Sequence, residues 1–281
     1  MSPLILSAIL LAAILHATWN ALIKISGDRL VIMAATTAIT SILTLPLLVY
    51  LPLPSPSSWV YLALSAAIHT FYMLVLVRAY GKGDFAQIYP LTRGSAPLLT
   101  AVLGLAFLRE TMSATESLGM ALIVAGIFAL ALETNKGKLQ LTRSALFYSL
   151  LTSFCIACYS MIDGIGVRVS ENSLSFIVWM FFLNGFGVPF AAFLRRPRNE
   201  LMYTLKSTWK SAFAVAILST TGYALVVWGF SQERIAPIAV LRETSVLFAL
   251  LISYFLIKET FSLARVLIVT LILTGIVLLA L

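Results

Sequence analysis

Long apolar stretches alternate with short polar interruptions along the whole chain, and this pattern is the main guide to its fold. Each stretch holds about the 20 residues that a helix needs to cross a hydrocarbon core roughly 30 Å thick. Interruptions rich in polar residues, glycine and proline separate ten spans, near residues 3–24, 30–51, 57–79, 85–108, 113–132, 144–166, 173–194, 209–231, 235–257 and 263–281. Residues 133–143 and 195–208 are long enough to be linkers. We therefore expect an all-α integral membrane protein with ten transmembrane helices.

Composition leaves little chain for a water-soluble domain. Hydrophobic residues make up 60% of the 281 positions and charged residues 11%, against roughly 25% charged residues in a soluble domain. The net charge of +8 would suggest a nucleic-acid partner in a soluble protein. Here the basic residues lie in short loops beside apolar spans, where anionic lipid headgroups are the expected neighbours. The first span follows Met1 without the basic segment of a signal peptide, so we interpret it as a retained helix.

The second half of the chain repeats the first. The hexapeptide LRETMS at 108–113 recurs as IKETFS at 257–262, an offset of 149 that also superposes Arg93 on Arg242. Self-similarity at a fixed offset is typical of internal duplication. The predicted five-helix repeats cover residues 1–135 and 141–281.

Five is an odd number of helices, so the second repeat starts on the opposite side of the membrane and runs inverted relative to the first. The basic residues agree with this topology. Of the 19 Lys and Arg residues, 14 lie in loops at one face: Lys24, Arg29, Arg78, Lys82, Lys136, Lys138, Arg143, Arg195, Arg196, Arg198, Lys206, Lys210, Lys258 and Arg265. The opposite face has Arg109, Arg168 and Arg234. By the positive-inside rule the basic face is cytoplasmic, which places both termini outside.

Several motifs resemble one family of transporters. They are AYGKGD at 79–84 leading into YPLTRGSAPL at 89–98, the LRET turn at 108–111, and LRETS at 241–245. Over essentially its whole length the sequence resembles EamA-type members of the drug/metabolite transporter superfamily. The resemblance implies a secondary transporter that exports or exchanges metabolites, amino acids or drugs through a central cavity between two inverted halves. It also implies cytoplasmic termini, the opposite of what the charge distribution predicts.

Arg93 and Arg242 are the strongest candidates for a binding site. Arg93 lies about eight residues into its span, so a rise of 1.5 Å per residue places it about 12 Å deep, and Arg242 occupies the repeated position. A charge at that depth costs at least ~2.5 to 3.5 kcal/mol, so it faces a cavity or a partner. One interpretation is a clamp for a carboxylate or phosphate group. The other is helix stapling, with Arg242 paired to a neighbouring acid and Arg93 bonded to carbonyls that Pro90 and Pro97 leave free.

Glu243 follows Arg242 and is the acid that the span boundaries place deepest in the bilayer. A carboxyl group in a low dielectric favours its neutral form, which makes Glu243 a candidate for proton coupling. The alternative is that it neutralises Arg242 or Arg93. Asp163 and Lys24 lie near enough to span ends for their charged groups to reach the membrane surface.

Polar and aromatic side chains form stripes along several spans. Because residues i, i+3 and i+4 share a helix face, each stripe points one way, and in an apolar protein we expect it to face the bundle interior. His69, on one face with Tyr72, is interpreted as a packing residue. The side chains predicted to contact substrate, with plain packing as the alternative, are His16, Trp19, Asn20, Tyr72, Tyr89, Tyr159, Trp179 and Tyr223.

Pro90, Pro97 and Pro237 interrupt the fourth and ninth spans and are candidates for gating, although proline is common in membrane helices. Gly126 and Gly275, in the fifth and tenth spans, suit close helix packing. We expect these two helices to support the cavity or to form a homodimer contact.

Other classes of function fit less well. The acids and the two histidines are not clustered as a metal-dependent enzyme requires, and no nucleophile elbow or phosphate-binding loop appears. We predict no enzymatic activity, cofactor, metal or nucleic-acid partner, and expect a small-molecule substrate and lipid as partners. A membrane sensor, an assembly subunit or a lipid-linked sugar flippase of the same fold is the alternative. The expected location is a bacterial or archaeal cytoplasmic membrane, while substrate, direction and coupling ion stay open.

Overall fold

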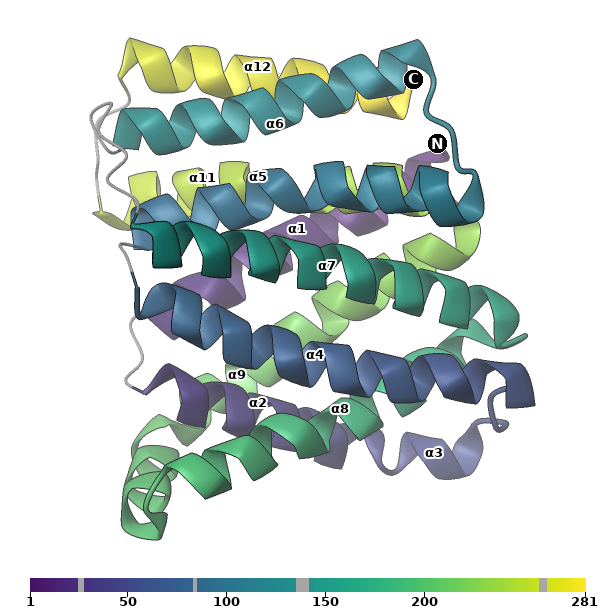
Figure 1. The fold of residues 1–281 in the computed structure, drawn as a ribbon, viewed down its shortest axis with the longest axis vertical. Helices are drawn as coiled ribbons and strands as arrows, with labels where there is room; N and C mark the ends of the chain where they lie inside the picture. Colours follow the sequence, from purple (N-terminus) through teal and green to yellow (C-terminus); the bar gives the residue numbers. More distant parts are fainter. Residues whose placement is uncertain (25–27, 83–84, 135–141, 258–261) are drawn as a thin grey trace.

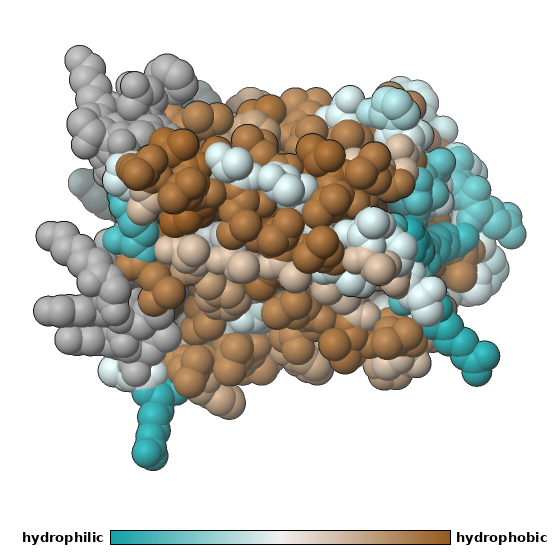
Figure 2. Space-filling model, turned by 90° about the horizontal axis from the view of Figure 1, so that it is seen from above, coloured by the Kyte–Doolittle hydropathy of each residue, from teal (hydrophilic) through white to brown (hydrophobic). Residues whose placement is uncertain are grey.

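The computed structural model describes residues 1–24, 28–82, 85–134, 142–257 and 262–281. Within these ranges every regular element is a helix, and ten helical segments are long and apolar enough to cross a membrane, as the hydropathy pattern predicted. The helices run back and forth in one bundle with both termini at the same end (Figure 1). A wide apolar belt covers the face seen in Figure 2, with hydrophilic residues gathered beyond it. A bilayer requires this distribution, because it solvates no polar groups in its core.

The first half supplies five spans. Its elements are α1 (Pro3–Lys24), α2 (Arg29–Thr44), α3 (Leu47–Tyr50), η1 (Pro56–Ser58), α4 (Trp59–Tyr80), α5 (Phe85–Leu103), η2 (Gly104–Leu108) and α6 (Ala114–Thr134). The third span begins with a short 3₁₀ helix, η1, and the fourth ends in a short π-helix, η2. Asp28 caps α2 by accepting hydrogen bonds from the Leu30 and Val31 N–H groups. The second span is divided between α2 and α3 at Pro46, which has no N–H to continue the helix.

The second half supplies the other five spans and differs from the sequence prediction in two places. Its elements are α7 (Arg143–Val169), α8 (Ser173–Arg195), α9 (Arg198–Gln232), α10 (Ile235–Arg242), α11 (Ser245–Ile257) and α12 (Leu263–Ala280). The expected linker over 195–208 is wrong, because a helix starts directly after Pro197 and its polar first turns extend past the apolar part of α9. The ninth span, predicted over 235–257, is present but contains a break after Arg242 that the pattern did not predict. There the N–H groups of Glu243 and Thr244 donate to carbonyls three residues back, which ends α10.

Helices of the two halves pack against each other in matched pairs. The first helix of one half packs on the third of the other, so that α1 contacts α9 and α7 contacts α4. The second helices pair with each other, α2 with α8, and so do the fifth, α6 with α12. This reciprocal pairing is what two inverted repeats produce, and it places the space between the halves near the middle of the bundle.

α6 and α12 lie side by side at one edge of the bundle (Figure 1). A Cβ atom on Gly275 would lie 2.7 Å from the carbonyl oxygen of Gly119, and one on Gly126 would lie 2.3 Å from Cγ1 of Ile272. The two backbones therefore approach each other as small residues allow in membrane helices. Neither helix contributes a described residue to the central cavity, in keeping with a supporting role.

Candidate functional site

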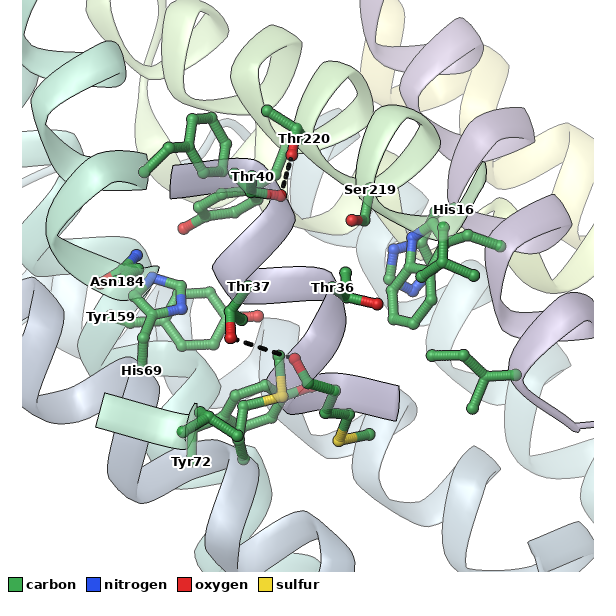
Figure 3. A pocket seen from close by; sticks show the side chains of 18 of the residues that line it. His16, Thr36, Thr37, Thr40, His69, Tyr72, Tyr159, Asn184, Ser219 and Thr220 are labelled. Carbon is green, nitrogen blue, oxygen red and sulfur yellow. Dashed lines mark hydrogen bonds between the residues drawn. The ribbon is translucent and has the colours of Figure 1, made fainter. Parts of the chain in front are cut away.

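A cavity of about 140 Å³ lies between the two halves, with space for the centres of roughly ten water molecules. Both halves line it, and Figure 3 shows hydroxyl, imidazole and phenol groups pointing toward it from several helices. Seven of the side chains predicted from the sequence are among its walls: His16, Trp19, Tyr72, Arg93, Tyr159, Tyr223 and Arg242. His69, interpreted from the sequence as a packing residue, also lines the cavity, and sequence reasoning missed further polar groups in the walls: Thr36, Thr37, Thr40, Asn184, Ser219 and Thr220.

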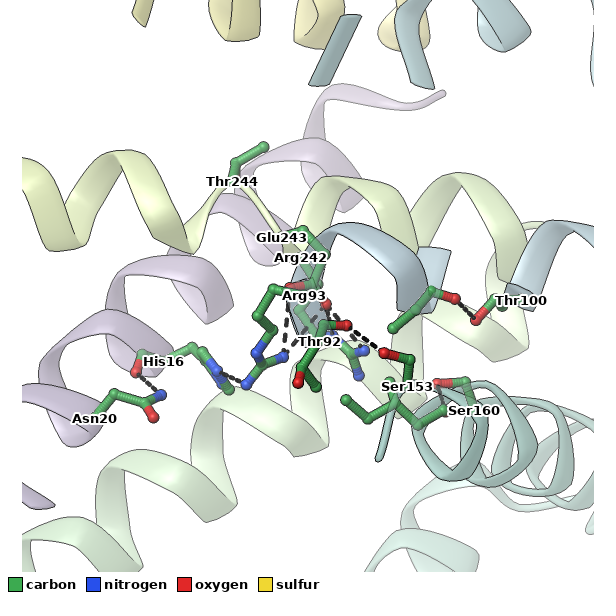
Figure 4. A network of polar contacts seen from close by, with 12 residues as sticks. His16, Asn20, Thr92, Arg93, Thr100, Ser153, Ser160, Arg242, Glu243 and Thr244 are labelled. Carbon is green, nitrogen blue, oxygen red and sulfur yellow. Dashed lines mark hydrogen bonds and ion pairs between the residues drawn. The ribbon is translucent and has the colours of Figure 1, made fainter. Parts of the chain in front are cut away.

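Arg93, Arg242 and Glu243 meet at one wall of this cavity (Figure 4). Arg93 Nη1 donates to both carboxylate oxygens of Glu243, at 3.3 and 3.4 Å. Arg242 donates from Nε at 3.3 Å and from Nη2 at 3.2 Å to Glu243 Oε1. The side chains of the two arginines are 6% and 4% exposed and that of Glu243 is 0% exposed. The predicted convergence of the repeated arginines is therefore present, with Glu243 between them.

The internal repeat explains why this cluster has two guanidinium groups but a single carboxylate. The offset of 149 that relates Arg242 to Arg93 relates Glu243 to Gly94. A Cβ atom on Gly94 would lie 3.0 Å from the Phe128 ring, so the first half uses this position for packing. Two guanidinium groups therefore share a single carboxylate, and the cluster carries one excess positive charge.

His16 and Asn20 extend the arginine cluster along α1. His16 Nε2 lies in hydrogen-bond contact with Arg93 Nη2. Because a guanidinium group only donates, this ring nitrogen accepts, which requires a neutral imidazole. Asn20 Nδ2 donates to the His16 carbonyl at 2.8 Å and faces a smaller neighbouring pocket. The Trp19 ring packs edge-on against His16, with centroids 4.8 Å apart.

Aromatic rings pack beside the arginines: Tyr72, Tyr159 and Tyr223 line the cavity, and Tyr89 lines the smaller neighbouring pocket. Tyr89 lies 5.6 Å from the Arg93 guanidinium carbon and Tyr159 lies 5.8 Å from that of Arg242, within range of cation–π attraction. Tyr159 also packs edge-on against Tyr72 and Tyr223, at centroid separations of 5.3 and 5.7 Å. These tyrosines form a continuous aromatic surface.

Two predictions about individual side chains are not met. Trp179 lies outside the cavity walls and packs edge-on against Trp59, because it is closer to the start of α8 than the residues that face inward. Asp163 does not reach the membrane surface: its side chain is 0% exposed and lies 2.9 Å from His69 Nε2. The Lys24 side chain lies outside the described residues.

The prolines do not coincide with the break in the ninth span. Pro237 occupies the first turn of α10, where a missing N–H leaves no bond unmade. Pro97 is buried in α5, which continues to Leu103. Pro90 is also in α5, and its side chain lies outside the described residues. Their part in gating stays a prediction.

Ion pairs join the halves at the end of the bundle that carries the termini. Arg168 donates to Glu110 at 2.8 Å and to the Phe230 and Glu233 carbonyls at 2.8 and 2.7 Å. Arg234 of the second half pairs with Glu116 of the first. Glu110 also accepts a 2.9 Å hydrogen bond from the Ile235 N–H. We name this set, Glu110, Glu116, Arg168 and Arg234, the terminal-face cluster.

Comparison with known proteins agrees with the two-repeat architecture. The chain matches the EamA-like transporter family twice, over residues 3–132 and 143–281. No curated protein matches the chain. A solved structure described as "Crystal structure of protein" is similar in fold, with a TM-score of 0.76 and 15% identity over 98% of this chain and 94% of that one. Because the family match covers nearly the whole sequence, the chain belongs to the EamA-like transporter family of the drug/metabolite transporter superfamily.

Proposed function

We propose that this protein is a secondary active transporter that carries a small metabolite with an anionic group through the central cavity by alternating access. The single observation that carries the anionic preference is the excess positive charge of the Arg93–Glu243–Arg242 cluster. Both guanidinium groups line the cavity. A buried cation without a full counter-charge is costly in a membrane, and a carboxylate or phosphate group on the substrate would supply that charge in a geometry that guanidinium matches.

The other walls favour a substrate with an apolar or aromatic body. The aromatic surface of Tyr72, Tyr159 and Tyr223 lies next to the arginine wall. The cavity walls also contain threonine and asparagine side chains, which can hydrogen-bond neutral polar groups. A cavity of about 140 Å³ suits a metabolite rather than a large drug.

The two halves are joined at one end of the bundle, which supports loading of the substrate from the opposite, basic face. The terminal-face cluster joins the halves at the end with the termini. By the positive-inside rule the opposite, basic face is cytoplasmic, so a substrate would enter from the cytoplasm and leave outside, as export or exchange requires. A reporter fused to the C-terminus and active only in the periplasm tests this orientation, and activity of a cytoplasm-specific reporter there contradicts it.

A ligand-stabilisation screen of the purified protein tests the function. Amino acids, organic acids, phosphonates and cationic drugs are added, and the thermal unfolding temperature is measured. We expect stabilisation by anionic compounds and a loss of affinity of at least tenfold in Arg93→Ala and Arg242→Ala, with Arg198→Ala on the exposed start of α9 as the matched control. Transport of the best ligand in proteoliposomes completes the test. Preference for cations, or unaltered affinity in both arginine variants, would refute the anionic clamp.

A further inference from the structure

Asp163 on α7 is a second fully buried carboxylate, separate from the arginine cluster. Its side chain is 0% exposed. Oδ2 lies 2.9 Å from His69 Nε2 and accepts a 2.6 Å hydrogen bond from the Tyr223 hydroxyl. Oδ1 has no hydrogen-bond partner among the residues that the structure describes. A buried carboxylate with an unsatisfied oxygen is costly, and binding a proton relieves that cost.

His69 connects this carboxylate to the cavity. Its side chain is 15% exposed and lines the cavity wall, where Figure 3 shows the ring beside Tyr159. It stacks on the Tyr159 ring at a centroid distance of 4.4 Å, and Tyr223 covers its edge at 5.5 Å. Imidazole is the side chain that ordinarily gains and loses a proton between pH 5 and 8. A proton in the cavity therefore has direct access to His69 and, through it, to Asp163.

The surroundings leave this pair one negative charge when no proton is bound. The neighbouring helices present uncharged phenols, the arginine cluster on the far side of Tyr159, and the threonine and asparagine side chains of α2 and α8. Tyr159 on α7 and Tyr223 on α9 contact the pair directly. Tyr72 on α4, Arg93 on α5 and Arg242 on α10 line the same cavity, and Glu243 lies between the two arginines. One bound proton makes the pair neutral overall.

We infer that His69 and Asp163 form the site at which the transporter binds and releases a proton during its cycle, the role that the sequence suggested for Glu243. This inference rests on the proposed transport function. Protonating Glu243 would leave two guanidinium groups without their carboxylate, whereas protonating the His69–Asp163 pair removes an unpaired negative charge. The pair also bridges the halves, because His69 belongs to α4 and Asp163 to α7. A rocking motion of the halves changes their contact and hence the retention of the proton.

Tyr159 links this proton site to the arginine cluster. One neighbour of its ring is His69, in a stacked contact, and another is the Arg242 guanidinium carbon, at 5.8 Å. A proton on the pair and an anion at the arginines attract each other across this ring, so each favours the binding of the other. Anion affinity should therefore rise as the pH falls through the range in which the pair gains its proton.

The test needs no organic substrate, because the probe is the proton alone. Wild-type protein and variants are reconstituted in proteoliposomes on a solid-supported membrane, and charge displacement is recorded after a pH jump. We expect a transient in the wild type that falls at least tenfold in Asp163→Asn and in His69→Gln. Glu200→Gln, on the exposed start of α9, is the matched control for a surface acid. Size-exclusion profiles confirm that each variant is folded.

Tyr223→Phe separates a proton-binding role from a structural one. Removing the hydroxyl takes one donor from Asp163 and keeps the ring packing, so the transient should persist with an altered dependence on pH. A transient that survives undiminished in folded His69→Gln would overturn the inference. If Asp163→Asn does not fold, His69→Gln and Tyr223→Phe decide. If the arginine cluster does not bind anions, the proton transient is still expected. Each of the two proposals can therefore be refuted without the other.

Discussion

Replacing Glu243 by glutamine tests the account of the arginine cluster most directly. The substitution keeps the shape of the side chain and removes the one carboxylate that Arg93 and Arg242 share, so the buried charge rises from one positive unit to two. Arg93 keeps the neighbouring His16 and Tyr89. Arg242 keeps the Tyr159 ring at 5.8 Å. These remaining contacts do not replace the negative charge of a carboxylate 3.2 to 3.4 Å from each guanidinium group.

The expected loss of stability follows from the burial of all three groups. At an effective dielectric constant of 20, two unit charges about 4 Å apart attract by about 4 kcal/mol, which offsets much of the cost of removing them from water. Deleting one partner of a buried ion pair typically costs about 3 to 5 kcal/mol, because the remaining charge stays buried. Glu243→Gln should therefore lose about that much free energy of unfolding.

The assay is equilibrium unfolding in mixed detergent micelles, followed by intrinsic fluorescence. Arg242→Met combined with Glu243→Gln is the decisive comparison, since it restores the wild-type excess of one positive charge at similar volume. We expect this double variant to be more stable than Glu243→Gln alone, and Arg242→Met alone to remain close to the wild type. Equal stability of Glu243→Gln and the wild type, or additive losses in the double variant, would refute the reasoning.

Three further predictions concern other parts of the molecule. Gly275→Val should lower the unfolding free energy by about 1 to 3 kcal/mol, because its Cβ would lie 2.7 Å from a carbonyl oxygen of α6, and should leave ligand affinity unaltered in a binding titration. Burial raises the pKa of Asp28, but the 2.6 Å hydrogen bond from Arg196, the positive charge of Arg196 and the hydrogen bonds from the Leu30 and Val31 N–H groups together outweigh it, so the net pKa is lowered. The stability difference between wild type and Asp28→Asn should be fully present above about pH 4 and disappear as the pH falls through the folded-state pKa, with a constant difference contradicting this. Arg168→Gln should speed amide hydrogen exchange at residues 230–235, whereas Arg109→Gln should not. Equal exchange in both variants would contradict a stabilising role for Arg168 in the terminal-face cluster.

The sequence was sufficient for the spans, the duplication and the inversion. A helix in lipid must satisfy its own backbone, so apolar length alone locates a crossing, and an odd number of crossings per repeat inverts the second copy. The repeat also paired Arg93 with Arg242 before any geometry was known, because residues related by an internal two-fold occupy equivalent depths. These conclusions concern position along a helix, which local composition determines.

Partners across helices required the tertiary structure. His69 and Asp163 are 94 residues apart, and the pattern gives no sign that they share a hydrogen bond. α8 is apolar around most of its circumference, so no polar face indicates that Trp179 points away from the cavity. Depth judged from span boundaries also misplaced Asp163, because α7 extends to Val169 and neighbouring helices cover that turn.

The ninth span shows both what the sequence predicts and what only the tertiary structure decides. The sequence by itself predicts a membrane span over residues 235–257 that carries Arg242 and Glu243. Only the tertiary structure decided that the helix breaks at Glu243 and that its carboxylate lies between guanidinium groups of both halves. The physical reason is that hydropathy measures the free energy of a segment in lipid, whereas a buried ion pair forms where two distant segments pack, and its energy depends on their contact.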